Sequence, residues 1–183
     1  MRKCIVSVTG HRHWKNREWE RENLLNGVVR LVELLNSTFD KKTEIVLIHG
    51  CATGVDLWFG EHAMSLGLPI ELYLPFPRIT QIVKGKMSPL QADSLNRQIE
   101  YADKVVVVNQ KFFYHGYERR NWALVDRCHI LASYYTRSRS GSGNAFRRAE
   151  KKKKPVVDLR EIIKTNFLPK SIHDINLLGG QLL

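Results

Sequence analysis

Continuously apolar, β-branched runs alternate along this chain with stretches in which apolar residues recur every three or four positions. Such runs are typical of strands buried on both faces, and the intervening period is that of an amphipathic helix. Repeated alternation of strand and helix predicts a parallel sheet with helices packed against its two faces. The sequence therefore predicts an α/β fold.

Six segments have the composition of strands, and amphipathic segments lie between them. The predicted strands are residues 4–9, 44–49, 70–74, 104–109, 130–135 and 155–159, and the helices are centred near residues 24–35, 55–66, 95–102, 122–125 and 145–149. The runs 45–48 and 105–108 lack polar residues and are both predicted to be buried on two faces. We predict a Rossmann-like three-layer sandwich with a mostly parallel sheet of about six strands.

The chain of 183 residues has the length of one domain with a substantial core. Residues 1–165 are predicted to form this domain, and residues 166–183, with weak periodicity, a C-terminal appendage. No apolar run reaches the roughly 18 residues of a membrane span. Three cysteines without paired spacing predict neither a disulfide framework nor a zinc site, a pattern typical of the reducing cytoplasm.

Basic residues exceed acidic ones by 29 to 18, which gives a formal net charge of +11. This balance favours anionic partners such as nucleotides or nucleic acid. Part of the excess has a structural interpretation, because the run Lys151-Lys152-Lys153-Lys154 falls where a helix is expected to end and the helix dipole favours cations. Nucleic acid stays an alternative partner beside a small anionic ligand.

Three turns that follow predicted strands carry small and polar residues. In parallel α/β sheets, ligands bind beyond the carboxyl ends of the strands, where such turns meet. The second turn leaves a buried strand and enters a helix directly, so its amides are expected to face an anion with support from the helix dipole. Its spacing matches neither the dinucleotide fingerprint nor the lysine-containing P-loop. The turns are Thr9-Gly10-His11-Arg12, His49-Gly50-Cys51-Ala52-Thr53-Gly54-Val55-Asp56 and residues 139–144.

Several side chains near these turns have both a structural and a functional interpretation. Asp56 is favoured by the dipole in a first helical turn, and could equally accept a hydrogen bond from a ribose or base. Cys51 is either a small residue that fills the turn or a thiol activated at a helix N-terminus. The loop with Tyr114 and Tyr117 is either ordinary surface or a platform for a base. The histidines have no ligand-like spacing, so we predict no metal site.

Taken in order, the motifs resemble the SLOG superfamily, Rossmann-like proteins related to DNA-processing protein A and the LOG cytokinin-activating enzymes, and within it the YpsA-like group of small bacterial and phage proteins. The resemblance covers residues 4–159, and Gly50-x-Ala52-x-Gly54-Val55-Asp56 is its most specific part. It implies a nucleotide or nucleotide-derived ligand, and the sequence identifies no separate cofactor. The implied ligand-binding residues are Thr9, Gly10, Arg12, Gly50, Ala52, Thr53, Gly54, Asp56, Asn109, Arg120, Asn121, Gly141, Ser142, Gly143 and Asn144.

Two departures from the superfamily decide between functions. Thr53 stands where DNA-processing proteins usually have arginine, and Arg147 where the LOG enzymes have an acid. The leading hypothesis is therefore a sensor or binding protein for a nucleotide-derived ligand. The alternatives are a hydrolase of nucleotide N-glycosidic bonds, with Asp56 or Glu61 as acid or base, and a protein that binds single-stranded nucleic acid. The sequence leaves turnover and homo-oligomerisation open.

Overall fold

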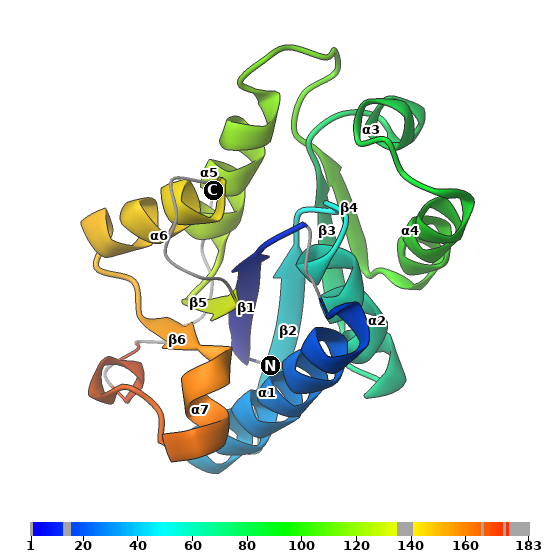
Figure 1. The fold of residues 1–183 in the computed structure, drawn as a ribbon. Helices are drawn as coiled ribbons and strands as arrows, with labels where there is room; N and C mark the ends of the chain where they lie inside the picture. The colour runs from blue at the N-terminus through cyan, green and yellow to red at the C-terminus, as the bar shows by residue number, and fades with distance from the viewer. Residues whose placement is uncertain (1, 13–15, 135–140, 166, 174, 176–183) are drawn as a thin grey trace.

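The structure, a computed structural model, describes residues 2–12, 16–134, 141–165, 167–173 and 175 (Figure 1). Within them a six-stranded sheet has the order β4-β3-β2-β1-β5-β6, and each neighbouring pair is parallel. This all-parallel sheet confirms the predicted fold class. Residue 135 of the fifth predicted strand and residues 139–140 of the third turn lie outside the described residues. The strands are β1 (Arg2–Gly10), β2 (Thr43–His49), β3 (Ile70–Leu74), β4 (Lys104–Val107), β5 (Ile130–Tyr134) and β6 (Val156–Asp158).

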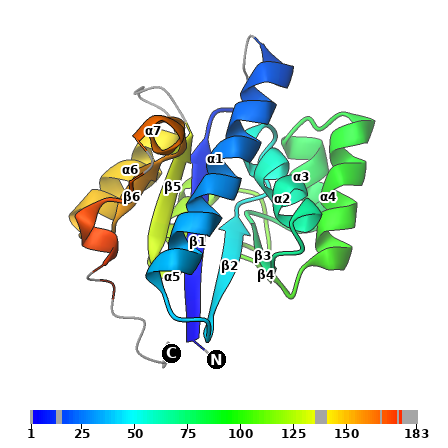
Figure 2. The same ribbon diagram turned by 90° about the horizontal axis from the view of Figure 1, so that it is seen from below.

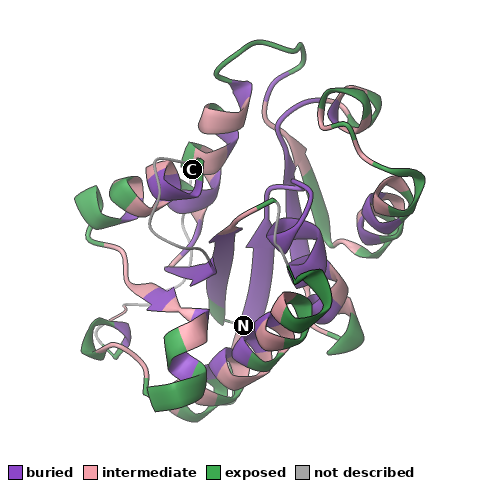
Figure 3. Ribbon diagram, viewed as in Figure 1, coloured by how far each residue is buried: buried purple, intermediate pink, exposed green. Residues whose placement is uncertain are grey.

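Helices cover both faces of the sheet and complete the three layers. Figure 2 shows α1 (Arg17–Thr38) lying along β1 and β2, with α2 (Val55–Ser65) on one side and α7 (Leu159–Thr165) on the other. The opposite face carries α5 (Gly116–Arg127) and α6 (Gly141–Lys151), which pack against each other. Each face has its own apolar core, and the central strands are buried along most of their length (Figure 3). Between β3 and β4 lie α3 (Arg78–Lys84) and α4 (Pro89–Tyr101).

The strand order reverses at β1, and this reversal positions the site. From β1 the chain adds β2, β3 and β4 in one direction, and then crosses back to place β5 on the free side of β1. In open α/β sheets the crevice at such a switch point is where ligands bind. A ligand site is therefore expected near the carboxyl end of β1, where β2 and β5 lie on its two sides.

The prediction that residues 105–108 form a strand buried on both faces was wrong. β4 is an edge strand, Val105 is 41% exposed, and the strand ends at Val107 rather than at residue 109. A valine run favours a strand but carries no information about its place in the sheet, which depends on contacts distant in sequence. Two short helices, α3 and α7, were also not predicted, and α7 begins at residue 159, where a strand was expected to end.

The described part of the C-terminal tail packs on the domain. A short 3-10 helix, η1 (Lys170–Ile172), buries Ile172 completely in the core on the α1 face of the sheet, and Leu168 and Ile175 pack against the same core. All three cysteines are buried and unpaired. Among the helices that the structure describes, none combines the length and apolarity needed to cross a membrane.

Candidate functional site

A cavity of about 190 Å³ opens at the switch point, between the carboxyl end of β1, Leu131 of β5 and the helices α5 and α6. Its mouth is formed by polar residues from the predicted turns, and its interior by residues of the strands and helices beneath them. The structure thus brings together many of the residues that the sequence singled out. The predicted ligand-binding residues that line it are Thr9, Gly10, Arg12, Ala52, Asp56, Arg120, Asn121, Gly141 and Ser142.

Hydrogen bonds join the three turns into one surface. The Val55 amide at the start of α2 donates to the His11 carbonyl after β1, at 3.2 Å. The Ser142 hydroxyl at the start of α6 donates to the Gly10 carbonyl at 2.7 Å, between segments far apart in the sequence. These two hydrogen bonds hold the residues after β1 against the starts of α2 and α6.

The turn between β2 and α2 contributes mostly to this internal order. The Ala52 amide donates to Asp56 Oδ2 at 3.1 Å, so one of the amides expected to face an anion is already satisfied. Gly54 has a φ of +80°, and a Cβ there would lie 2.6 Å from the carbonyl oxygens of both His11 and Arg12. Only glycine combines this backbone conformation with such close packing. Gly54 is therefore required by its neighbours in the fold.

A buried ion pair lies where this turn meets α5. Arg120 Nη1 is 2.9 Å from Asp56 Oδ2, and the two side chains are only 5% and 7% exposed. Gly50 makes room for the pair, because a Cβ there would lie 1.3 Å from Arg120 Nη1. Arg120 Nε is buried and has no partner among the described residues. A pair of this kind is sensitive to the loss of either member, since the other charge would stay buried without compensation.

The groups beneath the turn are uncharged. His49 is completely buried, and this burial, assisted by the nearby Arg120, lowers its pKa to about 4 against the opposing effect of Asp56. Burial likewise raises the pKa of the Cys51 thiol well above its usual range. Cys51 therefore stays protonated and fills the turn, which decides between the two interpretations that the sequence left open.

Glu61, a catalytic candidate from the sequence, does not line the cavity. It accepts hydrogen bonds from Ser94 of α4 at 2.7 Å and from Arg21 of α1 at 2.8 Å, so it joins the helices on the other face of the sheet. The acidic candidate that does line the cavity is Asp56.

Other predicted residues support the site from outside. Asn109 donates to the carbonyls of Pro75 and Gly116, at 2.8 and 3.2 Å, and so holds the loop after β3 against the start of α5. Asn144 accepts a hydrogen bond from Arg147, the residue that stands in place of an acid. Neither residue lines the cavity, and neither do Gly50, Thr53, Gly54 and Gly143. Within the described ranges, no three His, Cys, Asp or Glu residues gather to hold a metal ion.

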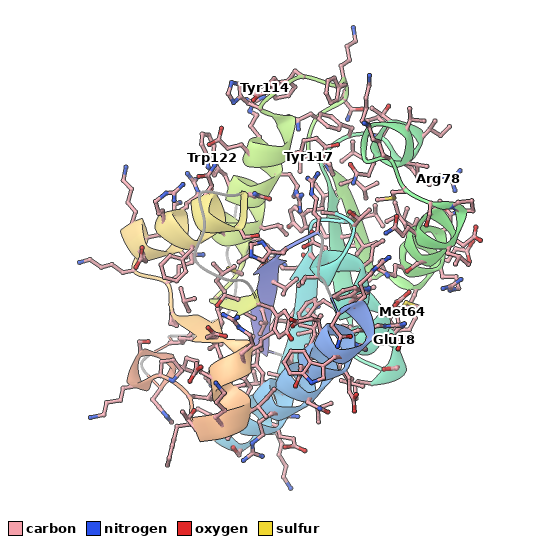
Figure 4. The ribbon with its side chains drawn as sticks, viewed as in Figure 1. Glu18, Met64, Arg78, Tyr114, Tyr117 and Trp122 are labelled. Carbon is pink, nitrogen blue, oxygen red and sulfur yellow. The ribbon has the colours of Figure 1, made fainter. Side chains whose placement is uncertain are left out.

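The start of α5 reaches the mouth through Tyr117. The Arg12 guanidinium lies 5.0 Å from the centre of the Tyr117 ring, which packs against Phe76 on another side. Tyr114, at the outer tip of the loop, is 86% exposed (Figure 4). Of the two tyrosines that the sequence offered as a base platform, only Tyr117 contacts a residue of the cavity mouth.

The interior of the cavity was missed by sequence reasoning. It is lined by Ser7, Val8, Leu124, Val125, Leu131 and Ala145. Most of these residues are typical of core positions and carry no functional pattern. One signal was present, because Ser7 interrupts the apolar run of the first strand.

No protein-family model matches this sequence, and no curated protein matches it. Among solved structures, DNA-processing protein A from Streptococcus pneumoniae is similar with a TM-score of 0.58 and 18% identity, over 84% of this chain and 49% of that one. This chain thus spans about half the length of the pneumococcal protein. DNA-processing protein A from Helicobacter pylori, reported with its mode of binding single-stranded DNA, has a TM-score of 0.58 and 16% identity, over 90% and 74% of the two chains.

The molybdenum cofactor carrier protein from Chlamydomonas reinhardtii is also similar, with a TM-score of 0.51 and 18% identity over 85% of this chain and 75% of that one. At these identities the similarity concerns the fold. It agrees with what the resemblance to the SLOG superfamily implied. The chain has the Rossmann-like fold of DNA-processing protein A and the molybdenum cofactor carrier protein.

Proposed function

We propose that this protein binds a nucleotide or a nucleotide-derived small molecule in the cavity between β1 and β5, as a sensor or binding protein. One observation carries the proposal: the cavity coincides with the reversal of strand order, and residues of the three turns line it. Rossmann-like sheets bind their ligands at this place. A position in the YpsA-like branch is part of the same proposal and rests on the motif pattern.

The mouth of the cavity suits an anionic group. Helix α6 begins at Gly141, which lines the cavity, and a helix N-terminus carries partial positive charge. Arg12 and Asn121 add side chains that can donate hydrogen bonds. The net charge of +11 would favour the encounter with an anion.

The cavity also limits the size of what it can enclose. Its volume of about 190 Å³ is below the roughly 300–1,000 Å³ of sites that enclose drug-sized molecules. It therefore holds a part of a nucleotide, and the remainder lies at the mouth. Of the two carboxylates considered for hydrolysis, Asp56 and Glu61, only Asp56 lines the cavity. In the alternative of an N-glycosidic hydrolase, Asp56 is therefore the remaining candidate for the acid or base.

A panel of AMP, ADP-ribose, NAD and cyclic nucleotides, titrated by calorimetry and followed by thermal shift, tests the proposal. We expect saturable binding by at least one of them, weakened about tenfold or more by Arg12→Gln because charged hydrogen bonds are strong. Arg30→Gln is the matched control, because Arg30 lies on α1 and pairs with Glu33 outside the cavity. Absence of saturable binding across the panel overturns the proposal.

Binding of single-stranded nucleic acid is the second candidate, favoured by the aromatic residues of the loop before α5. Lys84 and Arg119 lie 4.8 and 5.6 Å from the ring centres of Phe112 and Phe113, and both rings are partly exposed. Aromatic rings beside cations are the surface on which single strands stack. This candidate predicts retention on oligonucleotides that falls steeply with salt and weakens in Phe112→Ala.

A further inference from the structure

The walls of the cavity change from polar to apolar with depth. On α5, Arg120 lies toward the mouth and Leu124 one turn deeper, and on α6 Ser142 is followed in the same way by Ala145. One helical turn corresponds to about 5–6 Å of depth. On β5, the cavity is lined by Leu131, near the start of the strand and so far from its carboxyl end. The cavity thus has a polar mouth and an apolar floor.

Ser7 is the exception to this gradient. It lies beside Leu131 in the register of β1 and β5, and it lines the cavity floor. Its side chain faces the helices α5 and α6, because Val6 and Val8 belong to the core on the other face and side chains alternate along a strand. Ser7 is completely buried, and its hydroxyl has no hydrogen-bond partner among the described residues.

An unpartnered hydroxyl at this depth indicates a ligand contact. A buried polar group without a partner lowers stability, and in most proteins such groups are paired. A single ordered water needs two to four polar partners. The lining side chains at about the same depth as Ser7 are Leu124, Leu131 and Ala145, which offer a water none. The neighbouring Cys128 thiol has a pKa raised by burial to about 11 and is therefore neutral. The floor thus offers apolar contact, one hydroxyl and no charge.

We propose that the cavity takes the nucleobase end of its ligand, with Ser7 hydrogen-bonded to the edge of the base and the phosphate at Arg12 and the N-terminus of α6. This inference rests on the proposed nucleotide binding. It adds the orientation of the nucleotide in the cavity and identifies the base as the part that the cavity floor recognises. A nucleobase has apolar faces and a polar edge, which matches the floor. A phosphate or a bare ribose would bury several polar groups against leucine, valine and alanine, and that is costly.

Calorimetric titration with the four nucleoside 5′-monophosphates, the free bases and ribose 5-phosphate tests this orientation on wild type and on Ser7→Ala. We expect Ser7→Ala to weaken the preferred nucleotide by about 3- to 10-fold, the effect of one neutral hydrogen bond. We expect binding of ribose 5-phosphate to be unchanged, and the matching free base to compete with the nucleotide.

Ser133→Ala is the matched control. Ser133 is also a buried serine of the sheet, but its hydroxyl donates to the Val157 carbonyl at 3.2 Å and it does not line the cavity. This variant should lower the melting temperature and leave affinity unchanged. Ser7→Ala should do the opposite, because it removes a hydroxyl that has no partner in the free protein.

The outcomes separate the two proposals. If no nucleotide binds wild type, both fail. If a nucleotide binds but Ser7→Ala changes neither its affinity nor its preference among bases, nucleotide binding stands and the orientation is overturned. Equal weakening of ribose 5-phosphate and nucleotide by Ser7→Ala would place the sugar on the floor and would likewise overturn it.

Discussion

The two glycine-containing turns that enter helices at the carboxyl edge have different roles. At the β2–α2 turn, the Asp56 carboxylate accepts the Ala52 amide, and Gly54 packs against the backbone after β1. At the start of α6, Gly141 and Ser142 line the cavity, and a Cβ on Gly141 would meet only Asn121, at an ordinary 3.6 Å. The β2–α2 turn is required by the fold, and the start of α6 faces the cavity. The turn that resembles the superfamily most closely is therefore mainly structural.

The largest effect is expected from removal of the cation in the buried ion pair where the β2–α2 turn meets α5. Arg120→Met leaves Asp56 buried without its partner and should lower the free energy of unfolding by about 3–5 kcal/mol. Urea denaturation measures it, with the exposed neighbour in Arg119→Met as a control expected to stay within about 0.5 kcal/mol. A loss below about 1 kcal/mol for Arg120→Met would contradict a structural role for the pair.

The next prediction separates backbone strain from packing. Gly54 and Gly67 both have positive φ, of +80° and +65°, but a Cβ on Gly67 would have nothing within 4 Å. Gly67→Ala should cost about 1 kcal/mol of stability, and Gly54→Ala roughly 2–4 kcal/mol because it adds a steric clash. Thermal and urea unfolding of the two variants compare them directly. Equal losses of stability in the two variants would mean that the packing of Gly54 against the β1–α1 loop adds nothing to the cost of the substitution.

A smaller effect is expected from pH, through His49 at the start of the β2–α2 turn. Its pKa falls from 6.5 to about 4 on folding, so the unfolded state binds the proton more tightly. The stabilisation is present above pH 6.5 and is lost as pH falls toward 4, by roughly 2 kcal/mol between pH 7 and pH 5. His49→Asn, which keeps an acceptor for the Cys51 amide, should remove this part of the pH dependence. If the stability of wild type and of His49→Asn changed in parallel between pH 7 and pH 5, His49 would not be the source of this pH dependence.

The smallest effect on stability is expected at the start of α6. Gly141→Asp should change stability by less than about 1 kcal/mol, since a helix N-terminus favours an acid. It should nevertheless weaken nucleotide binding at least about tenfold, because it adds a negative charge where the phosphate is expected. Calorimetry with the neutral Gly141→Asn as control measures this. Unchanged nucleotide affinity in Gly141→Asp would mean that the phosphate does not bind at the N-terminus of α6.

Much of the fold could be predicted because apolar runs and helical periods are local features. Position in the sheet is not local, and so the valine run that includes Val105 was assigned to the interior although it forms an exposed edge. Short helices also escaped prediction, since the seven residues of α3 or α7 hold too few turns to establish a period.

The parts of the site that are formed by turns after strands could be predicted from the sequence. The parts that are formed by packing between distant segments could not. Gly10, Gly141 and their neighbours could be grouped because carboxyl ends of parallel strands share one edge. The pairing of Asp56 with Arg120 joins residues 64 positions apart and leaves no local pattern. Glu61 follows the motif at regular spacing, but its contacts are with α1 and α4.

Ligand binding in the β1–β5 cavity is tested by an NMR titration of the backbone amides with the preferred nucleotide. We expect saturable chemical-shift changes that are largest at Gly10, Leu131 and Ser142, which line the cavity from three elements, and no change at Gly67. Shifts confined to the loop around Phe112 and Tyr114 and abolished by salt, with the cavity amides unmoved, would contradict it.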